Sequence, residues 1–184
     1  RLPNGGILTG PRGTTIENFV RQASVDGDPP AVAALLDGEL SELSVTLLKD
    51  ADLQLVTMGT ADGMRIYRRS LSLLLITAAR ELYPDTQVFI DHSVSNGGYF
   101  CHVENNSQFG DKELKALKAR MEEIVAANDR IVRDEIPIQD AIILFANNGD
   151  QDKVRLLKYR AKPTLVIYSL RETRDYFHGY MVPR

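Results

Sequence analysis

The chain has 184 residues, a formal net charge of −3 and 43% hydrophobic residues, which fits one or two domains with a buried core. The charge excludes a chain that is basic throughout, as many nucleic-acid-binding proteins are. The single cysteine, Cys101, excludes an internal disulfide and fits a reducing compartment. No apolar run approaches the ~18 residues of a membrane span, and no signal peptide is visible. We therefore expect no membrane partner and a cytoplasmic location.

Residues 1–60 combine one short helix with several short strands. Helical spacing of apolar residues predicts a helix over 16–23. The apolar run 31–36 predicts a strand that turns at Asp37-Gly38, and alternation over 51–58 predicts the last strand. One helix and several strands in so short a segment favour a β-grasp domain.

The stretch 66–82 predicts one long helix around which the rest of the chain is organised. Asp62 and Gly63 precede it as start signals, and Pro84 ends it because proline disfavours helical geometry at the preceding residue. Two apolar stripes at helical spacing indicate packing on two sides. The first consists of Tyr67, Leu71, Leu74, Leu75, Ala78 and Leu82, and the second of Ile66, Leu73 and Ile76.

The remaining residues alternate between strands and helices. Strands 87–92 and 99–103 form a hairpin through the turn Asn96-Gly97-Gly98. A helix then starts at Asp111, with Leu114, Leu117, Met121, Ile124 and Val125 on its apolar face. Further along we expect a strand over 130–136, helices over 137–145 and 150–159, and a strand over 164–170.

Two segments resemble parts of threonyl-tRNA synthetases. Asp37-Gly38-Glu39-Leu40, followed by 49–57, is similar to the TGS domain that precedes the editing domain in those enzymes. The helix containing Tyr67-Arg68-Arg69-Ser70, and the order of elements after it, resemble their second additional, editing-type domain. The resemblance implies an α+β fold: a TGS-like β-grasp domain over 1–60 and an editing-type domain over 64–184, built around the long central helix.

The resemblance also locates a metal site. In those synthetases, two histidines four apart on the helix, together with a cysteine and a histidine near the end of the domain, hold a metal. The matching positions here are Arg69, Leu73, Phe177 and Met181. Arginine has no lone pair to give a metal and leucine cannot ligate. The resemblance therefore implies a degenerate site with no zinc and no hydrolysis of mischarged tRNA.

The motif His92-Ser93-x-Ser95-Asn96-Gly97-x-Tyr99 is more similar to uridine-kinase-type proteins that carry the same N-terminal domains. This resemblance implies a non-catalytic accessory or regulatory region of an ATP-dependent nucleoside kinase. Its kinase domain would follow in the same chain and would bind ATP and magnesium. These residues contain no phosphate loop with a lysine, so the catalyst would lie elsewhere. We expect the chain, which starts at Arg1, to be part of a longer protein.

Arg65, Arg68 and Arg69 lie at i, i+3 and i+4 on the predicted helix and are candidates for binding a small anion or an RNA backbone. The favoured alternative is structural pairing with carboxylates. The pairing candidates are Asp62, Glu81 and Asp175, and the further candidate binding residues are His92, Ser93, Ser95 and Asn96.

Two other functions stay open. The first is a divergent aminoacyl-tRNA editing domain that hydrolyses an ester without a metal, with His92 or His102 as general base. The second is a nucleotide- or RNA-binding module acting through the TGS-like domain. A relocated metal site is disfavoured, because Cys101 and His102 are neighbours on a strand and point to opposite faces.

Overall fold

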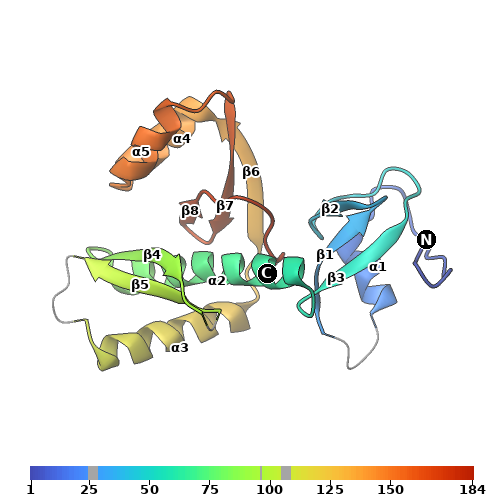
Figure 1. Cartoon of the computed structure of the whole chain (residues 1–184), viewed down its shortest axis with the longest axis horizontal. Coiled ribbons are helices and arrows are strands. Elements are labelled where there is room, and N and C mark those ends of the chain that lie inside the picture. The colour runs from blue at the N-terminus through green and yellow to red at the C-terminus, as the bar shows by residue number, and fades with distance from the viewer. Residues whose placement is uncertain (25–28, 96, 105–108) are drawn as a thin grey trace.

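The computed structural model describes residues 1–24, 29–95, 97–104 and 109–184. Figure 1 shows an elongated molecule in which the long helix α2 (Ala61–Leu82) lies along the middle. A small unit of helix and strands lies at the N-terminal end of α2, and all remaining elements are grouped around the rest of that helix.

The N-terminal unit is a three-stranded antiparallel sheet packed against one short helix. Asp37 and Gly38 join the first two strands and both have positive φ, as a type I′ hairpin turn requires. The predicted helix and the two predicted strands are confirmed, although the last strand is shorter than 51–58. The elements are α1 (Ile16–Ala23), β1 (Ala31–Leu36), β2 (Glu39–Ser41) and β3 (Leu53–Thr57), and the strand order is β2-β1-β3.

The start of α2 differs from the prediction. Asp62 and Gly63 do not precede the helix but lie in its first turn. Thr60 caps it, because its side chain accepts a hydrogen bond from Gly63 N at 3.0 Å. A Cβ at Gly63 would lie 2.0 Å from Thr57 O. The glycine is therefore required by the close approach of α2 to the end of β3, and not by a turn.

The two apolar stripes of α2 are confirmed in the middle of the helix. Leu73, Leu74 and Ala78 are buried, whereas Tyr67 and Leu82 are each 37% exposed. The helix contacts β1 and β3 of the N-terminal unit as well as elements that follow it in the chain. It ends at Leu82, shortly before Pro84, as predicted. This long helix thus supports both groups of strands.

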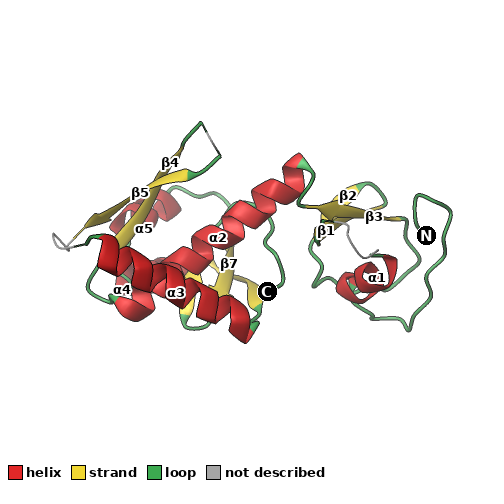
Figure 2. Cartoon of the chain, turned by 90° about the horizontal axis from the view of Figure 1, so that it is seen from below, coloured by secondary structure: helices red, strands yellow, loops and turns green. Residues whose placement is uncertain are grey.

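The elements after α2 form a hairpin, a helix and a second three-stranded antiparallel sheet. Figure 2, which views the molecule from below, shows α2 and α3 crossing in front of the second sheet. The β4–β5 hairpin lies toward the end of α2 that is away from the N-terminal unit. The predicted elements are all present, and β8 is an additional short strand. They are β4 (Gln87–Ser93), β5 (Tyr99–Glu104), α3 (Asp111–Ala127), β6 (Ile131–Pro137), α4 (Ile138–Asn147), α5 (Gln151–Lys158), β7 (Thr164–Leu170) and β8 (Thr173–Asp175), with sheet order β6-β7-β8.

The apolar face predicted for α3 is only partly buried. Leu117 and Ile124 are buried against the core, but Leu114 and Val125 are exposed. α3 packs mainly against α2, and a single helix–helix contact covers a narrower stripe than the five residues predicted.

A C-terminal segment, residues 176–184, lies along the junction between the two groups. Val182 N donates to Ser70 Oγ of α2 at 2.9 Å, and Arg184 forms an ion pair with Glu17 of α1. Met181 N contacts Glu42 Oε1 at 3.4 Å. These contacts hold the C-terminal segment against both α2 and the N-terminal unit.

The arrangement of helices with separate antiparallel sheets is consistent with the expected α+β class. The division into 1–60 and 64–184 stays a prediction, because α2 packs against both groups. None of the helices in the described ranges is long and apolar enough to cross a membrane.

Candidate binding cleft beside the central helix

A cavity of about 690 Å³ lies beside one face of α2. The helix contributes residues at helical spacing, beginning with Arg65 and Arg69 and continuing to Arg80. The opposite walls come from β4 and β5, from the turn between α4 and α5, and from the start of the C-terminal segment. Tyr99 and Phe177 are among the residues that these walls contribute. A volume in the range of 300 to 1,000 Å³ is typical of sites for small ligands.

Two arginines on the α2 wall lie close against glycines. A Cβ at Gly97 would lie 2.4 Å from Arg68 Nη2, and one at Gly179 would lie 2.9 Å from Arg69 Cζ. Both glycines also have positive φ, at 82° and 98°. The hairpin turn and the C-terminal segment therefore each approach one guanidinium group so closely that a side chain would displace it.

The predicted pairing of these arginines with carboxylates is correct only for Arg65. Arg65 Nη1 lies 2.5 Å from Asp62 Oδ1 on the exposed surface. Arg69 Nη1 instead donates to the carbonyl oxygen of Tyr180 at 2.5 Å. Among the residues that the structure describes, no carboxylate lies within ion-pair distance of Arg68 or Arg69. Glu81 and Asp175, the other predicted partners, pair with different cations.

At the end of the cavity near Arg80 and Lys153, basic and acidic side chains form ion pairs with one another. Lys153 Nζ lies 2.6 Å from Asp175 Oδ1, and Asp175 is almost fully buried. Arg80 Nη2 lies 3.4 Å from Asp150 Oδ2. Burial raises the pKa of Asp150, although the charges of Lys153 and Arg80 oppose this. Asp91 and Asp152 also line the cavity. The cations at this end already have partners, so the cations of the cleft without a carboxylate in ion-pair distance, among the described residues, are Arg68 and Arg69.

Sequence reasoning missed Arg80, Lys153 and Tyr99 as residues of the cleft. Arg80 was detectable, because it continues the face of Arg65 and Arg69 along the helix. Lys153 carried no such signal, since α5 reaches the cleft only through the tertiary fold.

The other predicted binding residues that the structure describes do not line the cavity. His92, Ser93 and Ser95 are exposed near the tip of the β4–β5 hairpin, and Asn96 lies outside the described residues. His92 Nδ1 is 3.3 Å from Asp91 Oδ2, and its ring stacks on Phe100.

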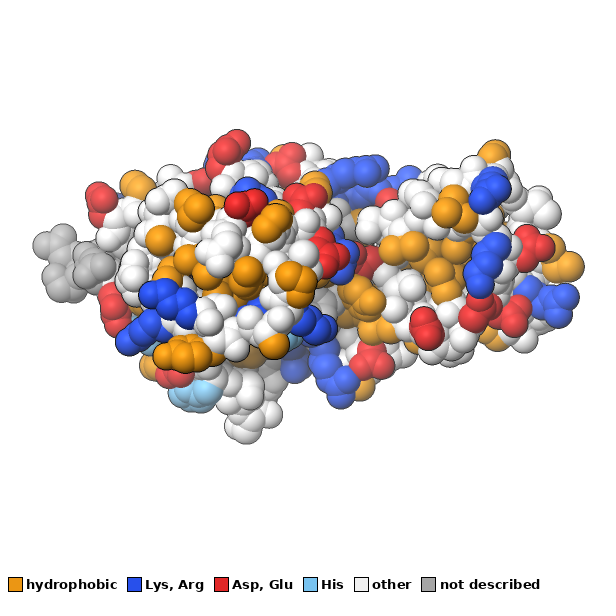
Figure 3. Space-filling view, turned by 90° about the horizontal axis from the view of Figure 1, so that it is seen from above, with side chains coloured by type: hydrophobic (Ala, Val, Ile, Leu, Met, Phe, Trp, Pro, Cys, Tyr) orange, Lys and Arg blue, Asp and Glu red, His pale blue; other side chains and the backbone are white. Residues whose placement is uncertain are grey.

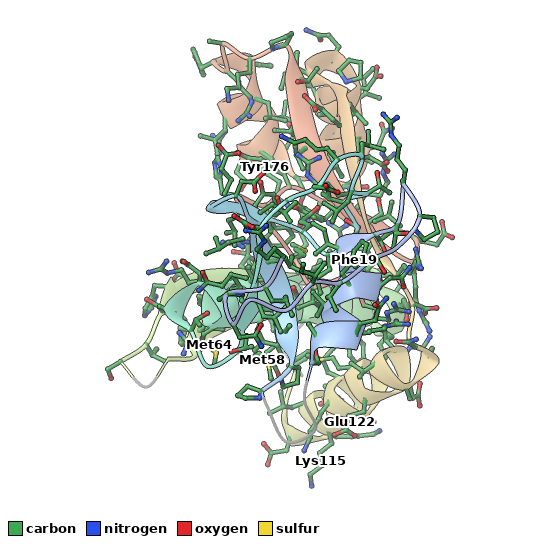
Figure 4. The ribbon with its side chains drawn as sticks, turned by 90° about the vertical axis from the view of Figure 1, so that its right-hand side faces the viewer. Phe19, Met58, Met64, Lys115, Glu122 and Tyr176 are labelled. Atoms are coloured by element: carbon green, nitrogen blue, oxygen red, sulfur yellow. The ribbon has the colours of Figure 1, made fainter. Side chains whose placement is uncertain are left out.

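The three histidines occupy separate places. The His102 ring stacks on Phe89 of the paired strand, and neither His92 nor His102 is part of the cavity wall. His178 Nε2 lies 2.5 Å from the Tyr176 hydroxyl, which also accepts from Arg160 Nη1 at 3.2 Å. Figure 4 shows Tyr176 beside the second sheet. Within the described part of the chain, no three His, Cys, Asp or Glu side chains are grouped so that they could hold a metal ion.

The four positions that the resemblance assigns to a metal lie where α2 meets the C-terminal segment. Leu73 is fully buried, and Met181 belongs to the same apolar cluster. Phe177 packs against that cluster and also lines the cavity. Arg69, one turn before Leu73, reaches the backbone next to Met181 through its bond to Tyr180. The space between helix and segment is thus filled by apolar side chains and bridged by a guanidinium group.

Comparison with known proteins finds relatives along nearly the whole chain. The chain is 30% identical over 182 residues to the threonine–tRNA ligase of Pelobacter propionicus. The aligned region covers 99% of this chain and 28% of the ligase. It is 36% identical over 155 residues to that of Acidithiobacillus ferrooxidans, covering 83% and 24%. For the Bacillus velezensis ligase, identity is 30% over 183 residues, covering 99% and 28%. No protein-family model matches the chain.

These matches make the chain homologous to part of the threonine–tRNA ligases. It spans only 24% to 28% of the length of those relatives. The TGS-like and kinase assignments stay predictions.

Proposed function

We propose that this chain is a divergent editing-type region homologous to that of threonine–tRNA ligases. In this proposal, the α2 cleft binds the 3′-terminal nucleotide of a tRNA, including its 5′ phosphate group, without a metal. In this proposal, residues 1–60 are a TGS-like β-grasp domain and residues 64–184 are the editing-type domain. The observation that carries it is the pair Arg68 and Arg69 on the wall of the cavity, without a carboxylate partner among the described residues.

The chemistry of the cleft favours a phosphate. Arginine is always charged and offers a planar fork of donors that matches phosphate oxygens. Arg69 uses one nitrogen on Tyr180, which leaves other donors for a ligand. Arg65 can turn to the same ligand, because its exposed pair with Asp62 contributes only about 0–1 kcal/mol. Tyr99 on the opposite wall offers an aromatic face on which a base can stack.

The residues at the predicted metal positions do not fit a metal. A zinc site needs three or four protein ligands, and Leu73 and Phe177 offer no lone pair. In the proposed site, the Arg69 bond to Tyr180 joins α2 to the C-terminal segment. The apolar cluster around Leu73 and Met181 fills the remaining space.

The same geometry favours binding over hydrolysis. A general base must come within hydrogen-bond reach of the attacking water, and neither His92 nor His102 lines the cavity. We expect no release of serine from mischarged threonine tRNA above the uncatalysed rate. Serine release that disappears in His92→Ala or His102→Ala would overturn this part of the proposal.

Adenosine monophosphate, the terminal nucleotide of tRNA, is a direct probe of the cleft in calorimetric titrations. The double variant R68A/R69A should bind it at least about tenfold more weakly, the loss of one charged hydrogen bond or more. R12A/R130A, which removes two arginines that do not line this cavity, should bind it like the unchanged protein. Equal binding by R68A/R69A, or no binding to the unchanged protein at low salt, would refute the proposed site. Circular dichroism checks that R68A/R69A is folded.

A second candidate function is the accessory region of a uridine-kinase-like nucleoside kinase. The replacement of all four predicted metal positions favours it, because a regulatory region needs a binding cleft but no catalytic metal. The kinase domain would follow in the same chain and supply the site for ATP and magnesium. Reading the coding sequence beyond Arg184 tests this proposal. A Gly-x-x-x-x-Gly-Lys-Ser/Thr loop after a strand would support it, and synthetase motifs would refute it.

A further inference from the structure

We infer that the end of α5 is a second contact for single-stranded nucleic acid, separate from the cleft. The contact consists of Arg155, Lys158, Tyr159 and Lys162, called here the α5 basic patch. It would bind the backbone and one base of a strand whose 3′ end occupies the cleft. The inference rests on the proposed function, because it takes a nucleic acid as the ligand.

The members of the patch share one side of the chain at the end of α5. Arg155, Lys158 and Tyr159 lie at i, i+3 and i+4, which places them on one helical face, and Lys162 follows in the loop. All four are exposed, and Tyr159 is exposed over 90% of its surface. In Figure 3, Lys and Arg side chains lie next to hydrophobic ones at this end of the molecule.

The three cations of the patch are not used within the fold. Five Lys and Arg residues lie between 153 and 162. Lys153 pairs with Asp175, and Arg160 donates to Tyr176. In the described ranges, Arg155, Lys158 and Lys162 have neither an ion pair nor a side-chain hydrogen bond. The chain carries a net charge of −3, so this group of free cations is a local departure from its overall charge.

A solvated helix face would explain the lysines but not the tyrosine. An aromatic ring that is almost wholly exposed loses the favourable burial that such side chains usually gain, and Leu156 beside it is also 72% exposed. An exposed ring among free cations is the combination that binds single strands. The cations contact phosphates while a base stacks on the ring, largely independently of sequence.

The patch lies within reach of the cleft. α5 begins at Gln151, and its neighbours Asp150, Asp152 and Lys153 line the cavity. The helix has 8 residues, and at about 1.5 Å per residue it spans roughly 12 Å. A strand whose last nucleotide enters the cleft beside the start of α5 can therefore follow the helix to the patch.

The test uses the whole chain and two probes. The first is adenosine monophosphate, whose binding is assigned to the cleft by its loss in R68A/R69A. The second is an unstructured RNA of about 12 nucleotides, within the site sizes known for single strands. The variant R155A/K158A/K162A removes three charges from the patch. K112A/K115A/K118A removes three from α3, where Lys115 points outward (Figure 4). We expect only the patch variant to bind the RNA at least about tenfold more weakly and to lower the salt-dependence slope by about 2, at about 0.7 per lost contact.

Tyr159 provides an independent test of the stacking contact. Y159A should weaken RNA binding by about tenfold, whereas Y159F should bind normally because stacking does not need the hydroxyl group. Equal RNA affinity of R155A/K158A/K162A and the α3 control, with adenosine monophosphate still bound, would refute the patch but leave the cleft. Patch-dependent RNA binding without adenosine monophosphate binding would refute the cleft instead. Absence of binding to both probes would overturn both.

Discussion

The buried hydrogen bond between Tyr168 and Glu42 should contribute measurably to stability, because it joins the two parts of the molecule. Glu42 follows β2 in the N-terminal unit and Tyr168 lies in β7, and both are buried. The tyrosine hydroxyl donates to Glu42 Oε1 at 2.5 Å. Burial first, and then the carboxylate, raises the pKa of Tyr168, so the hydroxyl stays a donor throughout the physiological range. We consider the change Tyr168→Phe.

The expected cost follows from what remains around the carboxylate. Without the hydroxyl, the partners that Glu42 keeps among the described residues are Met181 N at 3.4 Å and Arg133 Nε at 3.8 Å. A hydrogen bond to a charged group contributes about 1.5–3 kcal/mol net, and more when a buried charge loses its partner. We therefore expect Tyr168→Phe to lower the free energy of unfolding by about 2–3 kcal/mol, or the melting temperature by roughly 4–12 °C for a chain of this size.

Urea denaturation followed by circular dichroism measures this change. Tyr159→Phe is the matched control, since it removes the same hydroxyl from an exposed residue, and it should change the free energy by less than about 0.5 kcal/mol. A double-mutant cycle with Glu42→Gln should show a coupling of at least about 0.5 kcal/mol, as expected for residues in contact. A Tyr168→Phe variant as stable as the control would refute the buried bond and the packing of the two parts that it implies.

Three further predictions concern the cleft and its supports. Gly179→Ala places a methyl group 2.9 Å from Arg69 at a φ of 98°, so it should weaken binding of adenosine monophosphate in titrations, and unchanged affinity would contradict that contact. Leu73→Ala, at a fully buried position, should lower the free energy of unfolding by about 3–5 kcal/mol in urea denaturation. A loss below about 1 kcal/mol would contradict the close apolar packing around Leu73. Burial alone would raise the pKa of Glu17, but its bond and charge interaction with Arg184 lower it below the ordinary 4.5. The stability difference from Glu17→Gln should therefore be present at neutral pH and disappear as the pH falls through the lowered pKa, and a difference that grows in acid would have the wrong sign.

Much of the secondary structure could be predicted because its signals are local. The periodicity of 66–82 indicated a long helix, and Pro84 indicated its end. The positive-φ turns at Asp37-Gly38 and Gly97 joined strands as expected. Where prediction failed, the deciding contact was distant in sequence or set by packing. Gly63 was interpreted as a start signal, whereas its role is to let the helix approach Thr57.

The candidate site was predictable in its cations but not in their partners. The spacing of Arg65, Arg68 and Arg69 placed them near one another on the helix. Three equivalent arginines nevertheless meet three different environments: a carboxylate, a hairpin turn and a backbone carbonyl. These neighbours come from separate parts of the chain, and spacing along one helix carries no information about them.

By itself, the sequence determined most of the helices and strands of this protein and which residue types stand at the predicted metal positions. Both follow from local backbone preferences and from the identity of single side chains. Only the tertiary structure decided that Arg68 and Arg69 line a cavity without a carboxylate partner among the described residues. It also decided that Lys153 and Arg160 bond to Asp175 and Tyr176, whereas Arg155 and Lys158 have no ion pair within the same described ranges. The physical reason is that a charge acquires its partner through folding contacts between distant segments, and those contacts are set by the packing of the whole chain.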